Sequence, residues 1–163
     1  MSLGVHFALT TVDEQRLLAA AGDDDAVLQI VGEIEEADDE DWACQHDKAW
    51  DALHRCLTDG RLEYANGTFP LRAAVIGGRQ LIEDEDYTVS YTTAAEVRQV
   101  AEALETLEED WFRERYLALA HTDYAGPVDE DDFDYTWADL EDTREFFARA
   151  AEHGRAVIFT VDA

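Results

Sequence analysis

The sequence predicts a single α/β (or α+β) domain over residues 1–163, in which about five to six helices cover a small mixed β-sheet. Three observations support this fold class. The length of 163 residues suits one domain of ordinary size. Segments with strand character stand at both ends of the chain, and most segments between them show helical periodicity. The apolar fraction of 47% lies within the range of about 45–50% found in globular proteins, so we expect a packed core.

The first forty residues predict one strand followed by two helices. Residues 1–10 favour a strand, because apolar side chains alternate with small or polar ones. Residues 11–14 (TVDE) match a capping box, so we expect a helix that begins there and ends at Gly22. The three aspartates at 23–25 favour a second helix N-terminus, because negative charge stabilises that end of a helix. Residues 35–41 then form an acidic connection.

The middle of the chain predicts a third helix and a short buried strand. Over residues 46–58, Asp51 and Arg55 have the i,i+4 spacing of a helical ion pair. Residues 61–70 contain turn formers and predict a loop, and the apolar run 71–76 predicts a buried strand. The apolar face of the helix consists of Trp50, Leu53, His54 and Leu57.

Gly77-Gly78 ends the apolar run. We interpret this pair as a turn that requires positive φ, because neither of the glycine-rich phosphate-binding motifs is present. Residues 87–91 alternate in the manner of a strand, and residues 93–96 (TAAE) match a second capping box. The remaining expected elements are a helix over 94–107, a helix over 109–121, a loop over 122–136, a helix over 137–153 and a central strand over 156–161.

The order of these elements, together with several local patterns, resembles the YfbM-like family, a bacterial domain of unknown function. The most specific match is residues 47–58, DKAWDALHRCLT, which is similar to the family pattern D-K-x-W-x-x-L-H-x-x-L-T. Weaker matches are the opening strand with Gly4, the glycine pair at 77–78, the helix start at 91–97 and the closing helix and strand after Phe146. The resemblance implies an α/β fold over nearly the whole chain and implies no particular reaction.

The charge excludes some classes of partner. With 12 basic and 39 acidic residues, the net charge is −27. Because nucleic acids and anionic membranes bind cationic surfaces, we expect neither as a partner. Three explanations of the acidity stay open: a genome that favours arginine and alanine, adaptation to salt, or an acidic surface that binds a basic protein. Neither a transmembrane segment nor a signal peptide is evident, and Cys44 and Cys56 fit no disulfide framework, so we expect a cytoplasmic location.

One group of residues is a candidate site. His54 is a possible general base if Asp51, one helical turn away, orients its ring. The alternative is a core histidine bonded to a backbone carbonyl, with Trp50 as packing and Lys48 in a surface ion pair. The full set of candidate ligand-binding residues is Asp47, Lys48, Trp50, Asp51, His54, Gly77, Gly78 and Tyr91.

Metal and nucleophile motifs are incomplete in this sequence. The acidic run 129–134 offers oxygen ligands but lacks the glycine and the final glutamate of a calcium-binding loop. The cysteines and histidines do not have zinc spacing, and the G-x-S-x-G motif is absent. We therefore expect no metal, no cofactor and no catalytic residue.

Two hypotheses of function follow. The first is a non-catalytic binding domain whose acidic surface engages a basic protein or a small cationic ligand. One continuous acidic face would favour a partner, whereas evenly distributed acids would favour solubility alone. The second is a small-molecule-binding or hydrolytic enzyme with a pocket near His54 and Gly77-Gly78, which requires an exposed nitrogen on His54. The sequence leaves the oligomeric state open, with Trp42 and Tyr135 as candidate exposed aromatics.

Overall fold

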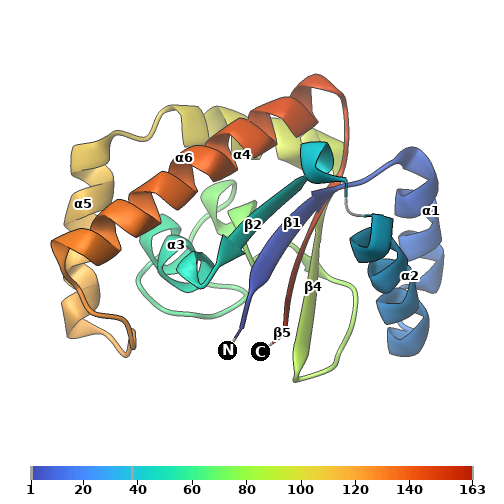
Figure 1. Cartoon of the computed structure of the whole chain (residues 1–163), viewed down its shortest axis with the longest axis horizontal. Coiled ribbons are helices and arrows are strands. Elements are labelled where there is room, and N and C mark those ends of the chain that lie inside the picture. The colour runs from blue at the N-terminus through green and yellow to red at the C-terminus, as the bar shows by residue number, and fades with distance from the viewer. Residues whose placement is uncertain (1, 38, 163) are drawn as a thin grey trace.

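The computed structural model describes residues 2–37 and 39–162, which form one β-sheet between two layers of helices (Figure 1). The sheet has the strand order β2-β1-β5-β4-β3. The strands are β1 (Gly4–Ala8), β2 (Ala43–Asp47), β3 (Arg79–Gln80), β4 (Tyr87–Thr92) and β5 (Val157–Asp162). The helices are α1 (Thr11–Ala20), α2 (Asp24–Ala37), α3 (Ala49–Leu57), α4 (Ala94–Glu105), α5 (Glu109–Leu117) and α6 (Glu130–Glu152). Three short 3-10 helices are η1 (Glu40–Trp42), η2 (Leu71–Ala74) and η3 (Ala118–His121).

The predicted fold class is confirmed, with one correction to the sheet. All four strand pairings are antiparallel, so the sheet is not of mixed direction and the α+β description applies. The C-terminal strand β5 lies in the centre, as expected from its apolar sequence. It pairs with β1 on one side, and this antiparallel pairing sets the start of β1 beside the end of β5 (Figure 1). Among the described residues, no helix is both long and apolar enough to cross a membrane.

Both faces of the sheet are covered, and this explains the apolar character of β5. Helices α1 and α2 pack on one face, against Ile158 and Val89. The core of the other face contains Phe159 of β5 together with residues of α3, α4, α6 and η2, and α5 joins it by packing against α3 and α6. Since successive side chains of a strand point to opposite faces, a central strand covered on both sides needs apolar residues at nearly every position.

Two predicted elements differ in the structure. Residues 43–47 form the edge strand β2, so the predicted helix from residue 46 begins only at Ala49. Residues 71–76 contain the 3-10 helix η2, not a strand, and pack against α3 and α4. A short apolar run fits a buried strand or a buried helical turn equally well, and here the contacts with helices decide the outcome.

The acidic run near residue 130 begins a helix rather than lying in a loop. Asp129 caps α6 by accepting a hydrogen bond from the backbone N–H of Asp132. The acids of the first turn lie where the helix dipole favours negative charge. At α1 the cap is Thr10, one residue before the predicted position, whereas the predicted Thr93–Glu96 capping box is fully formed.

Gly77 and Gly78 are required for close packing, not for positive φ as predicted. Neither is among the glycines with positive φ. A Cβ atom at Gly77 would lie 2.1 Å from the carbonyl oxygen of Arg72, and one at Gly78 would lie 2.6 Å from that of Tyr91. The backbone therefore passes too close to its neighbours to admit a side chain at either position.

We predict that Gly77→Ala lowers the free energy of unfolding by about 2 kcal/mol, because the added methyl group overpacks the contact with Arg72. The matched control is Gly32→Ala in α2, where an added Cβ meets no atom within 4 Å. That change should stabilise the protein by roughly 0.5–1 kcal/mol through helix propensity. Urea unfolding of both variants measures the two values. An unchanged Gly77→Ala variant would contradict the close-packing account.

Candidate functional site

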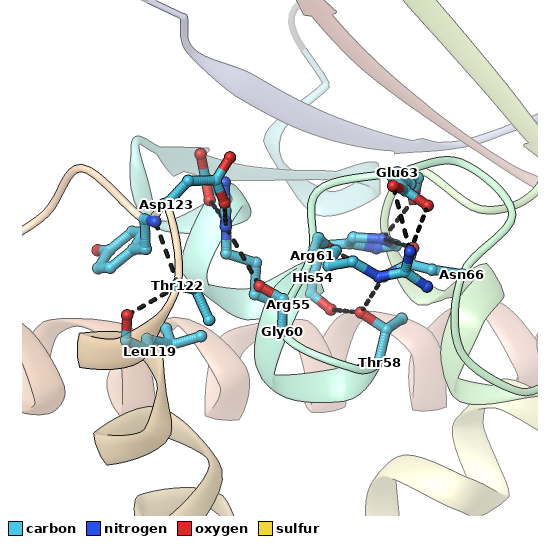
Figure 2. A network of polar contacts seen from close by, with 12 residues as sticks. His54, Arg55, Thr58, Gly60, Arg61, Glu63, Asn66, Leu119, Thr122 and Asp123 are labelled. Carbon is cyan, nitrogen blue, oxygen red and sulfur yellow. Dashed lines mark hydrogen bonds and ion pairs between the residues drawn. The ribbon is translucent and has the colours of Figure 1, made fainter.

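Helix α3 carries three of the eight predicted site residues, Trp50, Asp51 and His54, and nearly all of its side chains are buried. It packs against α6, α5, η2 and β2. The predicted ion pair is confirmed, with Arg55 Nε donating to Asp51 Oδ1 at 2.6 Å. Arg55 is only 5% exposed and also pairs with Asp123 through Nη1 at 2.6 Å (Figure 2). The polar residues of α3 are thus held in fixed positions by neighbouring loops.

His54 is a core histidine and not an exposed base. Its side chain is fully buried, and Nε2 donates to the Glu63 carbonyl oxygen at 2.8 Å and to Asn66 Oδ1 at 3.0 Å (Figure 2). Burial lowers the pKa of the imidazole, so the neutral form is favoured. Nδ1 is buried as well and has no hydrogen-bond partner within the described part of the chain. The general-base interpretation of His54, which required an exposed nitrogen, is therefore wrong.

The other apolar candidates do not gather around one pocket, although the backbones of Gly78 and Tyr91 are in contact. Trp50 packs in the core, and its Nε1 donates to the carbonyl oxygen of Ser2 at 3.1 Å. The Gly78 N–H donates to Ser90 Oγ at 2.8 Å. Tyr91 belongs to the core on the α1–α2 face of the sheet, where its hydroxyl donates to Glu14. The eight predicted residues therefore do not surround one pocket.

Lys48 and Asp51 do share a cleft, which we call the tyrosine cleft. It has a volume of about 530 Å³ and lies between the start of α3, the segment 124–127 and the first two turns of α6. Asp47 is exposed just outside it, at the junction of β2 and α3, with a φ of +48°. The lining residues are Lys48, Ala49, Asp51, Tyr124, Ala125, Gly126, Pro127, Asp132, Tyr135 and Thr136.

Asp132 organises the aromatic wall of the tyrosine cleft. Its Oδ2 accepts hydrogen bonds from the Tyr124 hydroxyl at 3.0 Å and from the Tyr116 hydroxyl at 2.5 Å. Burial, followed by the hydrogen bond to Asp132, raises the pKa of both tyrosines, so both hydroxyls stay protonated and keep donating. No basic side chain of the described residues forms an ion pair with Asp132. The Asp132 side chain therefore lies beside the tyrosine rings without a cationic partner from the described residues.

Tyr135 forms the exposed rim of the same cleft. It is 45% exposed, as its sequence position in an acidic segment suggested. Burial, and then the negative charges of Asp47, Asp139 and Asp132, raise the pKa of its hydroxyl. The rim therefore combines an accessible aromatic ring with a negative electrostatic potential.

A buried histidine–aspartate chain lies behind this cleft, and no sequence pattern predicted it. His46 Nδ1 contacts both carboxylate oxygens of Asp139, at 2.9 and 2.8 Å. His46 Nε2 lies 2.5 Å from His6 Nδ1, and His6 Nε2 lies 2.7 Å from the carbonyl oxygen of Ala74. The chain links α6, β2, β1 and η2, and its three side chains are at most 7% exposed.

The hydrogen-bond partners assign the protons of this chain. The Ala74 carbonyl only accepts, so His6 donates through Nε2 and accepts at Nδ1. His46 then donates through Nε2. Because its pKa is raised, it is an imidazolium that also donates from Nδ1 to the Asp139 carboxylate, whose own pKa is raised by burial. Burial lowers the pKa of His46, but the hydrogen bond and charge of Asp139 outweigh it and raise the pKa to about 10. Burial and the His46 charge hold the pKa of His6 well below its usual value.

A catalytic role for this histidine–aspartate chain does not follow. Its side chains are buried and inaccessible to a substrate, and the series of hydrogen bonds ends at the backbone carbonyl of Ala74. His6 stands in an apolar strand, and β2 was not predicted, so no local pattern relates the three residues. Among residues 2–37 and 39–162, no group of three metal-binding side chains comes together. Cys44 and Cys56 are both free and buried, and burial raises the pKa of the Cys56 thiol to about 12.

Comparisons with known proteins agree with the fold. A family model described as a domain of unknown function, DUF1877, matches residues 1–160. The crystal structure of a protein of unknown function, YfbM from Escherichia coli, matches with a TM-score of 0.73 and 19% sequence identity, covering 98% of this chain and 99% of that chain. At this identity the likeness concerns the fold alone. No curated protein matches the sequence.

We predict that stability is greatest near pH 6.5 and falls on both sides. The folded pKa of His46, about 10, exceeds the unfolded value of 6.5, so its contribution is complete below pH 6.5 and is lost as the pH rises toward 10. The folded pKa of His6 lies below 6.5, so acid favours the unfolded chain, which binds the extra proton. Urea unfolding at a series of pH values measures both limbs.

Asp139→Asn should lower the free energy of unfolding at neutral pH by about 3 kcal/mol and remove the alkaline limb, because His46 then has no counter-ion. The control is Asp142→Asn, which changes an exposed acid on the same helix. The control should keep the wild-type pH profile. Only the range from pH 6.5 to about 8 tests His46, because the unfolded chain begins to lose its Cys56 and tyrosine protons above that range. A decline of stability in this range that survives in Asp139→Asn would show that His46 is not the imidazolium of this chain.

Proposed function

The chain belongs to the DUF1877 family of domains of unknown function, and within that family we propose that this member is a non-catalytic, cytoplasmic binding domain that holds an alkylammonium group in the tyrosine cleft. The observation that carries the proposal is the pairing of an exposed tyrosine ring, Tyr135, with the unneutralised carboxylate of Asp132 in one concave site. Aromatic faces and carboxylates together are the usual surroundings of organic cations. The volume of about 530 Å³ also lies in the range of small-molecule sites.

The overall acidity supports a cationic ligand without defining the site. A net charge of −27 raises the local concentration of cations around the protein. The exposed acids are spread over α2, α4, α5, α6 and the loop before β4, and such an even distribution favours solubility by itself. Specific recognition therefore has to come from a local feature, and the tyrosine cleft supplies one.

The recognised chemistry is an ammonium group on an alkyl chain. It can come from a small polyamine or from a lysine side chain on a basic protein, and both were partners considered from the charge. The cleft also contains one positive charge, that of Lys48, which is exposed and makes no ion pair with any described residue. A bound cation would be repelled by this lysine, which gives the proposal a test with a definite sign.

We predict that the protein binds spermidine, and that Tyr135→Ala weakens this binding at least fivefold by removing the aromatic rim of the cleft. The matched control is Tyr64→Ala, since Tyr64 is 48% exposed and does not line the cleft. Isothermal titration of spermidine and of a lysine-containing peptide separates the two sources of the ammonium group. If Tyr135→Ala and Tyr64→Ala bind both probes as wild type does, the proposed site is wrong.

Lys48→Gln should strengthen spermidine binding about two- to threefold, because it removes a like charge several ångströms from the ligand. Arg98→Gln, which removes an exposed cation from α4 away from the cleft, is the control for the change in net charge. A Lys48→Gln variant that binds no better than Arg98→Gln would place the cation elsewhere on the protein.

A further inference from the structure

A second cleft lies at the other end of α3, and we call it the arginine cleft. It has a volume of about 590 Å³ and is bounded by the end of α3, the loop that follows it, η2, α5 and η3. Figure 2 shows Arg55, Thr58, Gly60 and Thr122 of its wall. Its lining residues are Arg55, Leu57, Thr58, Asp59, Gly60, Gly67, Thr68, Leu71, Trp111, Arg115, Ala118, Leu119 and Thr122.

Arg115 is held rigidly in this wall. Its Nε donates to the carbonyl oxygen of Cys56 at 2.6 Å, and its Nη2 donates to that of Thr58. The guanidinium carbon lies 4.7 Å from the centre of the Trp111 ring. These contacts fix the plane of the guanidinium and leave both N–H groups of Nη1 without an acceptor in the described part of the chain. A fixed fork of this kind is suited to a carboxylate.

Arg115 carries the uncompensated positive charge of the arginine cleft. No carboxylate of the described residues lies within ion-pair distance of it. Arg55 in the same wall is neutralised by Asp51 and Asp123. Asp59 on the rim is neutralised by Arg61 at 2.6 Å. Counted by themselves, the lining side chains Arg55 and Arg115 against Asp59 leave one positive charge, and Arg115 is the cation among them that has no ion-pair partner in the described part of the chain.

The rest of the lining is largely apolar. Leu57, Leu71, Trp111 and Leu119 contribute, and the methyl group of Ala118 is exposed at the mouth. A single positive charge beside an apolar surface matches a ligand with one negative charge and an apolar body. A multiply charged phosphate fits less well, because only one cation is free and the protein as a whole repels anions.

We propose that the arginine cleft is a binding site for organic monocarboxylates, with the carboxylate on Arg115 and an aromatic or aliphatic body against Trp111 and the leucines. This site is separate from the tyrosine cleft and does not depend on the function proposed for it. Arg115 also binds the last carbonyls of α3, so a change at Arg115 alone would mix ligand binding with helix stability. The test therefore uses a second variant that leaves Arg115 in place.

The experiment is a titration of the full-length protein with phenylacetate, and with phenylacetamide as its neutral counterpart, followed by calorimetry. We expect phenylacetate to bind, and phenylacetamide to bind at least tenfold more weakly. Ala118→Trp, which fills the mouth from an exposed position, should abolish phenylacetate binding without lowering the unfolding midpoint. Arg115→Gln should weaken phenylacetate binding at least tenfold and reduce its preference over phenylacetamide.

Three results would overturn the proposal: no saturable binding of phenylacetate at millimolar concentration, equal binding of the two probes, or unchanged binding in Ala118→Trp. Spermidine titration of Ala118→Trp keeps this test independent of the tyrosine cleft. If Ala118→Trp loses phenylacetate and keeps spermidine, two separate sites are present. If phenylacetate binding is lost in Tyr135→Ala and kept in Ala118→Trp, the anion occupies the other cleft and the arginine cleft is not the site.

Discussion

The buried chain Asp139–His46–His6–Ala74 is the interaction on which the arrangement of the α3–α6 side depends. It joins α6 to the edge strand β2, to β1 and to η2, and it places an ion pair where water does not reach. A buried pair adds little net stability, but removing one member leaves an uncompensated charge. Alternative positions of α6 over the sheet are therefore costly, and the first turns of α6, which carry the tyrosine cleft, are held in place.

The two ends of helix α3 border two different clefts. Its first turn contributes Asp51 to the tyrosine cleft, and its last turns contribute Arg55 and Thr58 to the arginine cleft. The ion pairs of Arg55 with Asp51 and Asp123 lie between the clefts, and the two carboxylates compensate the charge of Arg55. One short helix thus borders both proposed sites, one for an organic cation and one for a monocarboxylate, although the net charge of the whole protein is −27.

Much of the fold was predictable where neighbouring residues determine it. The Thr93–Glu96 capping box and the apolar face of α4 depend on contacts three and four positions apart. The central place of β5 followed from its continuous apolar sequence. Of the candidate site, the Asp51–Arg55 pair was predictable for the same local reason. Strand β2 was not, because its five residues carry one buried cysteine and one buried histidine among polar positions, and their environment comes from β1 and α6.

The sequence by itself therefore determined the helices with strong periodicity, the terminal strands, the family and the absence of a complete catalytic motif. Only the tertiary structure decided that His54 is buried, that Tyr91 lies on the opposite face of the sheet, and that His6, His46 and Asp139 meet. The physical reason is distance along the chain. Secondary structure reports interactions within one or two turns, whereas the His6–His46 contact joins residues 40 positions apart and the His46–Asp139 contact residues 93 positions apart. No local pattern encodes such meetings, because they arise only when the packed helices and strands bring those positions together.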